Sequence, residues 1–320
     1  MIRIALAPLF VACIENDLSH FTRDVSFAQS PDNRADILFV VDDSGSMRDE
    51  QDQLAAGFKA FVSGLDAAET DFHIAVITTT WDEANPMSVA FRGSPAVLTP
   101  EHDVLPLFAD RVQVDLVGSA MESGLEAAAM ALSDTATTAA NVGFLRDGAS
   151  LAVLFVSDED DCSDGGQLDG EPAEACYKRD EELLPPSHWV DLLRGNQVGD
   201  GDLVIGAIVG TPDSACDDNA IGDRYVTAAL MTDGLVYDIC NDDWSTLLND
   251  LGVRASGLMA TFQLPDPARP DTIVVDVDGM EVASDPVNGW TYDESNTSIT
   301  FHGAALPPRG SVVHVHYTVL

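Results

Sequence analysis

The chain has 320 residues, 46% of them hydrophobic, which is enough for a folded core and more than one domain. Its formal net charge of −39 comes from 54 acidic and only 15 basic residues. Such a surface repels nucleic acid and anionic lipid headgroups and attracts cations, so nucleic acid is excluded as a partner. The carboxylates either bind divalent metal or form a solvated surface adapted to salty surroundings, and composition alone does not separate the two.

The first thirteen residues are typical of a secretion signal. One basic residue, Arg3, precedes an apolar run over residues 4–12, far shorter than the roughly 20 residues that span a bilayer. The sequence LFVAC, ending at Cys13, resembles a bacterial lipobox, in which the signal is cut before a cysteine that receives lipid. We therefore expect a lipoprotein signal over residues 1–13, lipidation of Cys13 and membrane contact only through this lipid anchor. An ordinary signal peptide or a misassigned start are the alternatives.

A polar tether is expected over residues 14–34, with a short strand around Val25 to Phe27. Alternating strands and helices then predict an α/β domain over residues 35–257, with a mostly parallel sheet covered by helices on both faces. Its expected strands span residues 37–41, 72–78, 151–156, 203–209 and 234–239. Its expected helices span residues 54–65, 126–132, 188–193, 225–231 and 244–251.

Oxygen-bearing side chains follow the first of these strands. The apolar run stops at Asp42, and Ser44 and Ser46 come next in a D-x-S-x-S pattern. Ligands bind at the carboxyl ends of strands in an open parallel sheet, so we expect these three side chains to face one point.

Two further segments supply oxygens of the same kind. Ser119 precedes the helix expected over residues 126–132, where it could also serve only as an N-cap, and Asp158 follows the strand over residues 151–156. Hard divalent cations prefer oxygen ligands, and Mg²⁺ takes about six of them. Three hydroxyls and two carboxylates would leave one position open for a partner's carboxylate. Glu122 is expected to be an exposed first-turn glutamate, with a supporting role beside the metal ligands as the alternative.

The three pieces, in this order and with these flanking elements, resemble the von Willebrand factor A (vWA) domain and its metal-ion-dependent adhesion site (MIDAS). The resemblance covers about residues 35–255 and implies a Rossmann-like fold. It also implies that Mg²⁺ or Mn²⁺ is bound and that an Asp or Glu carboxylate of a protein ligand completes the octahedron. The implied metal ligands are Asp42, Ser44, Ser46, Ser119 and Asp158, with Ser119 where threonine is usual.

The function expected from this resemblance is metal-dependent, adhesion-type protein binding. The alternatives are a metal-stabilised scaffold in a cell-surface assembly and a metal-assisted hydrolase. The sequence contains no G-x-S-x-G elbow, H-E-x-x-H, Walker loop or dinucleotide fingerprint, so we expect a protein that is not an enzyme.

The five cysteines divide into Cys13 and two close pairs, Cys162 with Cys176 and Cys216 with Cys240. Sequential pairing into two disulfides is the simplest arrangement, and each could contribute about 3 kcal/mol in the chain-entropy model. A four-thiolate zinc site or free thiols are the alternatives, but no C-x-x-C spacing favours zinc. Disulfides imply an oxidising, extracytoplasmic location, at the cell surface or in the periplasm.

Two acidic segments remain. Asp160, Asp161 and Asp164 are expected to form a solvated acidic loop, with an additional Ca²⁺ site as the alternative. Residues 258–320, which include a proline-rich linker near their start, predict a small all-β domain, because alternating polar and apolar residues recur there and helix signals do not. Within this domain, Asp276 and Asp278 are interpreted as hairpin-turn residues, and the less favoured alternative is that they bind calcium.

Overall fold

The structure is a computed structural model of the chain. It describes residues 21–29, 32–114, 116, 118, 121–133, 141–168, 171–172, 175–199, 201–214, 216 and 220–320. The expected signal peptide, Cys13 and Ser119 lie outside the described residues.

The chain divides into two compact units, which are described separately. Ala28–Ala260 and Pro307–Ser311 form the α/β unit. The described residues 21–27, Thr261–Leu306 and Val312–Leu320 form the β unit. No helix in the described part of the chain is long and apolar enough to cross a membrane.

The α/β unit is built on a five-stranded sheet in the order β3-β2-β4-β5-β6, with every pairing parallel. Its strands are β2 (Arg34–Val41), β3 (Asp71–Thr78), β4 (Ser150–Ser157), β5 (Leu203–Val209) and β6 (Val236–Asp238). β2 and β4 lie side by side with Val41 opposite Val156, so both strands end at the same edge. This parallel sheet with helices confirms the predicted α/β class.

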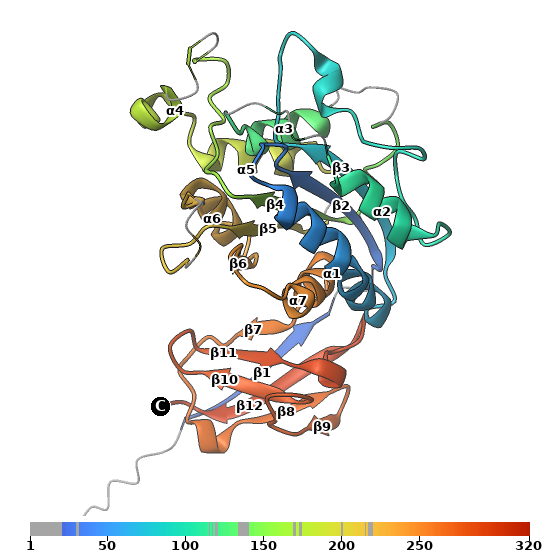
Figure 1. The fold of residues 1–320 in the computed structure, drawn as a ribbon. Coiled ribbons are helices and arrows are strands. Elements are labelled where there is room, and N and C mark those ends of the chain that lie inside the picture. The colour runs from blue at the N-terminus through green and yellow to red at the C-terminus, as the bar shows by residue number, and fades with distance from the viewer. Residues whose placement is uncertain are drawn as a thin grey trace, which may run out of the picture. The chain divides into compact units, whose positions relative to one another are not determined.

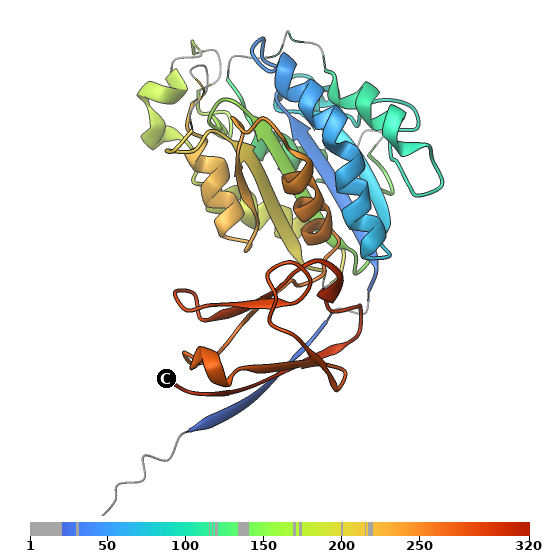
Figure 2. The same ribbon diagram turned by 60° about the horizontal axis from the view of Figure 1, so that its bottom comes forward.

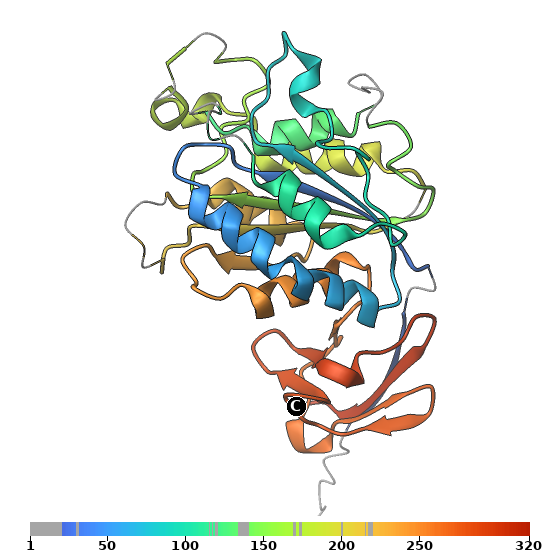
Figure 3. The same cartoon turned by 45° about the vertical axis from the view of Figure 1, so that its right-hand side comes forward.

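Helices cover both faces of the sheet because each buried strand alternates its apolar side chains (Figures 1 and 3). The helices are α1 (Arg48–Ala67), α2 (Val104–Val112), α3 (Gly124–Ala131), α4 (Ala175–Lys178), α5 (Pro186–Asn196), α6 (Asp223–Leu230) and α7 (Ser245–Ala255). Phe39 of β2 packs on the face of α1, α2 and α7, against Phe58, Phe61 and Phe108. Its neighbour Val40 belongs to the opposite core, which α3, α5 and α6 cover.

The β unit contains two sheets, with strand orders β1-β12-β8-β9 and β10-β11-β7. Their strands are β1 (Thr22–Ala28), β7 (Thr261–Gln263), β8 (Val274–Val277), β9 (Met280–Val282), β10 (Trp290–Asp293), β11 (Ser298–Phe301) and β12 (Val312–Thr318). Figure 2 shows β1, near the N-terminus, beside the C-terminal β12. The segment expected as a tether thus contributes a seven-residue strand, longer than the short strand expected around Val25 to Phe27.

The turn between β8 and β9 has the hairpin geometry expected from Asp278-Gly279. Both residues have positive φ, 51° and 80°, and Val277 pairs with Met280. The Asp276 carboxylate accepts the Gly279 N–H at 2.8 Å, and the Asp278 carboxylate accepts the Val312 N–H at 2.9 Å. Both side chains therefore act as turn residues.

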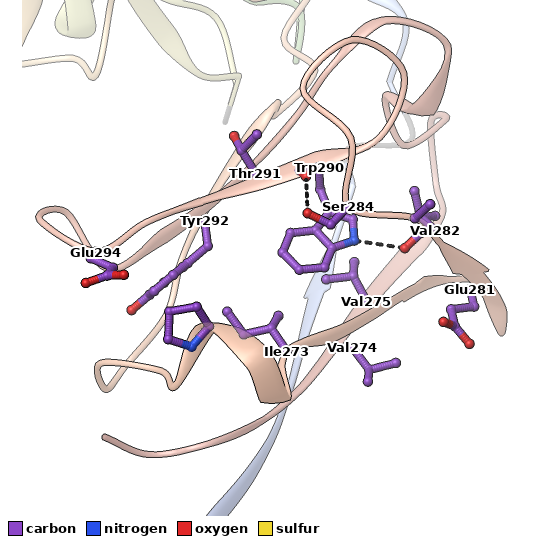
Figure 4. Close-up of a pocket in the computed structure, with 12 residues that line it drawn as sticks. Ile273, Val274, Val275, Glu281, Val282, Ser284, Trp290, Thr291, Tyr292 and Glu294 are labelled. Carbon is purple, nitrogen blue, oxygen red and sulfur yellow. Dashed lines mark hydrogen bonds between the residues drawn. The ribbon is translucent and has the colours of Figure 1, made fainter.

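A cavity of about 460 Å³ lies within the β unit (Figure 4). Trp290 lines it and donates its indole N–H to the Val282 carbonyl at 2.8 Å, while Ser284 donates to the Trp290 carbonyl at 3.2 Å. Both hydrogen bonds lie within the wall of the cavity, which also carries the carboxylates of Glu281 and Glu294.

Candidate metal centre

The end of β2 places Asp42 between two strands. The Asp42 N–H donates to the Val156 carbonyl of β4 at 3.0 Å, and the side chain is 0% exposed. Its carboxylate accepts the Ser44 N–H at 2.7 Å and the Ser157 hydroxyl at 2.6 Å. Asp42 is therefore held at the carboxyl edge of the sheet, as its position after a buried strand predicted.

The two serines of the motif lie together next to Asp42. Their hydroxyl oxygens are 3.1 Å apart, with Ser44 buried and Ser46 exposed. The chain then enters α1, where Gln51 donates to the Asp42 carbonyl at 3.0 Å and anchors the turn. The site is thus closed toward the sheet and open to solvent at Ser46.

Asp158 follows β4 and is also buried. Burial, above all, raises the pKa of Asp42 to about 7, and the charge of Asp158 adds to this shift. The structure therefore brings Asp42, Ser44 and Ser46 together with Asp158 nearby. Because Ser119 lies outside the described residues, its part in the site stays a prediction.

Two carboxylates at this edge were not among the predicted metal ligands. One carboxylate oxygen from each of Asp42, Asp43 and Glu122 lies within 4.8 Å of the other two, and we call these residues the carboxylate cluster. Thr80 donates its hydroxyl to Asp43 at 2.9 Å, and Thr79 donates to Glu122. Thus the end of β3 also contributes to the site.

The expectation of an exposed Glu122 is wrong, since its side chain is 0% exposed. α3 begins at Gly124, so Glu122 precedes the helix and turns inward. No motif marks it in the sequence, whereas Asp43 could have been noticed as the neighbour of Asp42.

Among the residues that the structure describes, no cationic side chain is paired with the carboxylate cluster. None of the ion pairs among the described residues involves Asp42, Asp43 or Glu122. Burial, followed by the charge of Asp42, raises the pKa of Glu122 to about 9. Carboxylate and hydroxyl oxygens are the ligands that Mg²⁺, Mn²⁺ and Ca²⁺ prefer, so the residues present fit a hard divalent cation.

The loop after Asp158 differs from the solvated acidic loop that was expected. Asp161 is 0% exposed and pairs with Arg224 at 3.0 Å. It also accepts the N–H of Leu125, and the Ser163 hydroxyl accepts that of Glu126, so this loop caps α3.

We call Asp161, Ser163 and Arg224 the Arg224 network. Asp164 is likewise buried, and its carboxylate accepts the N–H groups of Gly166 and Leu168. The expectation failed because the loop folds under the helix terminus, where backbone donors and one arginine satisfy its carboxylates.

The structure contains the two disulfides of the sequential pairing. Cys162 is bonded to Cys176 and Cys216 to Cys240, which close loops with sequence separations of 14 and 24. The first bridge ties the loop beside the Arg224 network to α4.

No protein-family model and no curated protein sequence matches the chain. Among solved structures, it is similar to the pilus adhesin SpaC from Lactobacillus rhamnosus GG, with a TM-score of 0.47 and 11% identity. That match covers 93% of this chain and 42% of the adhesin, so the chain spans less than half of the adhesin's length.

Two further solved structures are similar at lower scores. One is proximal thread matrix protein 1 from the mussel byssus with a zinc-occupied MIDAS motif, with a TM-score of 0.38, 14% identity, and coverage of 75% of this chain and 52% of that one. The other is the adhesive tip pilin GBS104 from Group B Streptococcus agalactiae, with a TM-score of 0.33, 11% identity, and coverage of 95% and 83%.

Proposed function

We propose that the α/β unit is a vWA domain that binds a protein partner through a divalent cation. One observation carries this proposal: the buried carboxylates of Asp42 and Glu122 converge beside two serine hydroxyls at the carboxyl edge of a parallel sheet, and no cationic side chain in the described part of the chain is paired with them. Ionised carboxylates in such a place need a positive charge, and a bound Mg²⁺ or Mn²⁺ supplies it.

The chemistry proposed for binding follows from the two sides of the site. The sheet side holds Asp42 and Asp158, while Ser46 faces solvent. A cation bound by Ser44, Ser46, Ser119 and these acids would keep a coordination position on the solvent side. An Asp or Glu carboxylate of a partner would fill that position.

In this proposal the protein is a binding module without a catalytic step of its own. It acts outside the cytoplasm, because two disulfides are stable in oxidising compartments. Anchoring through lipid on Cys13, as the N-terminal sequence predicts, would hold it at a membrane surface.

The test uses an array of short peptides that each contain one Asp or Glu, with Asn or Gln counterparts as matched controls. The full chain is expected to bind a subset of the acidic peptides in Mg²⁺, to release them in chelator, and to bind none of their amide counterparts. The Asp42→Ala variant should bind none of the array. Equal binding in chelator would contradict the proposal, whereas Mg²⁺ binding without any peptide binding would favour a metal-stabilised scaffold.

A further inference from the structure

Glu122 lies in the short segment that leads into α3, and its backbone is held on both sides. Its carbonyl accepts the N–H of Cys162, and the N–H of the next residue, Ser123, donates to the Thr79 carbonyl at 3.0 Å. Cys162 is itself held by its disulfide to Cys176. These contacts fix the backbone at Glu122, so the fold itself directs the side chain inward.

The two carboxylate oxygens of Glu122 have different surroundings. Oε2 accepts the hydroxyl of Thr79. Oε1 is buried and has no hydrogen-bond partner among the residues that the structure describes. Leaving a buried acceptor without a partner is unfavourable, and more so when it is charged, so this oxygen is expected to serve a bound group.

The surroundings of Glu122 suit a cation better than a hydrogen-bond donor. Its neighbours in the carboxylate cluster are acceptors, and their oxygens lie within 4.8 Å of one another. Oxygens on opposite sides of an octahedral cation are separated by about 4.2 Å for Mg²⁺ and about 4.8 Å for Ca²⁺, twice their usual bond lengths. One hard cation can therefore contact oxygens spaced like these.

We infer that Glu122 is a direct ligand of the divalent cation at this site, binding it through Oε1 while Thr79 holds Oε2. This inference rests on the proposed function, and it adds a residue that the vWA resemblance does not assign. A charged ligand from the chain strengthens the attraction between cation and protein. The cation is then retained before any partner carboxylate arrives.

The competing interpretation is that Glu122 stays a neutral carboxylic acid with a purely structural role. The two interpretations differ in what Glu122→Gln does. Glutamine keeps the size of the side chain and an oxygen that accepts from Thr79, but it carries no charge. A structural acid tolerates this exchange with no change in metal affinity, whereas a metal ligand does not.

The test is calorimetric titration of the chelator-stripped full chain with MgCl₂ and, separately, with MnCl₂. Loss of groups that only orient a metal ligand typically weakens metal binding by about 10–100-fold, so Glu122→Gln is expected to weaken it by about 100-fold or more. Glu126→Gln is the matched control. Glu126 is also a buried glutamate of this region, but its carboxylate accepts the Gly165 N–H at 3.1 Å and is not in the carboxylate cluster. Its variant should stay within about twofold of the parent.

The outcomes separate this inference from the proposed function. If Glu122→Gln binds like the parent while Asp42→Asn does not, the ligand assignment is overturned and the metal site stands. If the parent binds neither metal, both are overturned, and equal losses in the Glu122 and Glu126 variants also overturn the assignment. Should Glu122→Gln fail to fold, Glu122→Asp replaces it, because the shorter acid keeps the charge; unchanged affinity in that variant overturns the assignment.

Discussion

The carboxylate cluster and the Arg224 network both bury carboxylates in the α/β unit, but they neutralise them differently. Asp161 receives a guanidinium, a serine hydroxyl and a helix N–H from its own chain. From the described residues, Asp42 and Glu122 receive hydroxyl and amide donors and no cationic side chain. Buried charge is tolerated when it is paired, so the first arrangement is complete within the fold, whereas the carboxylates of the second, once ionised, would need a cation from outside.

This difference indicates why one acidic site is structural and the other suits binding. The Arg224 network caps α3 and fixes the loop around Cys162, so its contacts stabilise the folded state. The carboxylate cluster leaves a buried oxygen of Glu122 without a partner in the described part of the chain, and this favours ligand binding at a cost in stability.

Removing Arg224 should cause the largest loss of unfolding free energy among the changes predicted here. Arg224→Leu leaves Asp161 buried without its counter-charge, and breaking such a pair costs about 3–5 kcal/mol of unfolding free energy. The control is Arg194→Leu, because Arg194 contacts Asp191 at 3.5 Å and the Met231 carbonyl at 3.0 Å on the surface, so less than about 1 kcal/mol is expected. Urea unfolding in chelator measures both, and equal losses would show that the Arg224 network is not a special source of stability.

Adding metal should stabilise the protein through the carboxylate cluster. At an Mg²⁺ concentration about 100 times the dissociation constant, the chelator-treated parent should gain about 2.7 kcal/mol of unfolding free energy. Asp42→Asn should gain almost none. Thermal melts in NaCl of matched ionic strength provide the control for screening, and an equal gain in NaCl would remove the case for a specific site.

The stability of the protein should depend on pH through Glu126, a buried acid beside the Arg224 network. Burial raises the pKa of Glu126 from 4.5 to about 7, so its neutral form is favoured in the folded state. Its contribution is therefore complete below pH 4.5 and is lost as the pH rises through about 7.

Between pH 4.5 and 8, the metal-free parent should lose about 1–3 kcal/mol more than Glu126→Gln, which has no charge to bury. Thermal unfolding of the two proteins across this range, in chelator, provides the measurement. Parallel pH profiles would mean that Glu126 ionises in the fold without penalty.

The smallest effect is expected from a methyl group added beside the carboxylate cluster. In Gly118→Ala, the new Cβ would clash with a carboxylate oxygen of Asp43 and lie 2.9 Å from its carbonyl oxygen, so Asp43 must move. We expect Mg²⁺ affinity to fall about fivefold, or ~1 kcal/mol. Gly195→Ala in α5 meets no atom within 4 Å and should leave affinity unchanged. An unaffected Gly118→Ala variant would place Asp43 outside the metal site.

The sequence by itself determined the architecture that carries the site. Periodic apolar runs indicated the strands of the parallel sheet and most of its helices, although not α2, and the abrupt end of one run at Asp42 located the edge that carries the carboxylates. The spacing of the cysteines pointed to the two disulfides that the structure contains. These features are local, because side-chain periodicity and loop length act over a few residues.

Tertiary structure alone decided which carboxylates are neutralised and by what. Asp161 and Arg224 are 63 residues apart in sequence, and nothing near either residue indicates that they meet. Glu122 looked like a surface residue until its segment was held between Thr79 and Cys162. The same holds for β1, which pairs with β12 from the other end of the chain. The physical reason is that burial and charge compensation depend on contacts between distant segments, which no local pattern specifies.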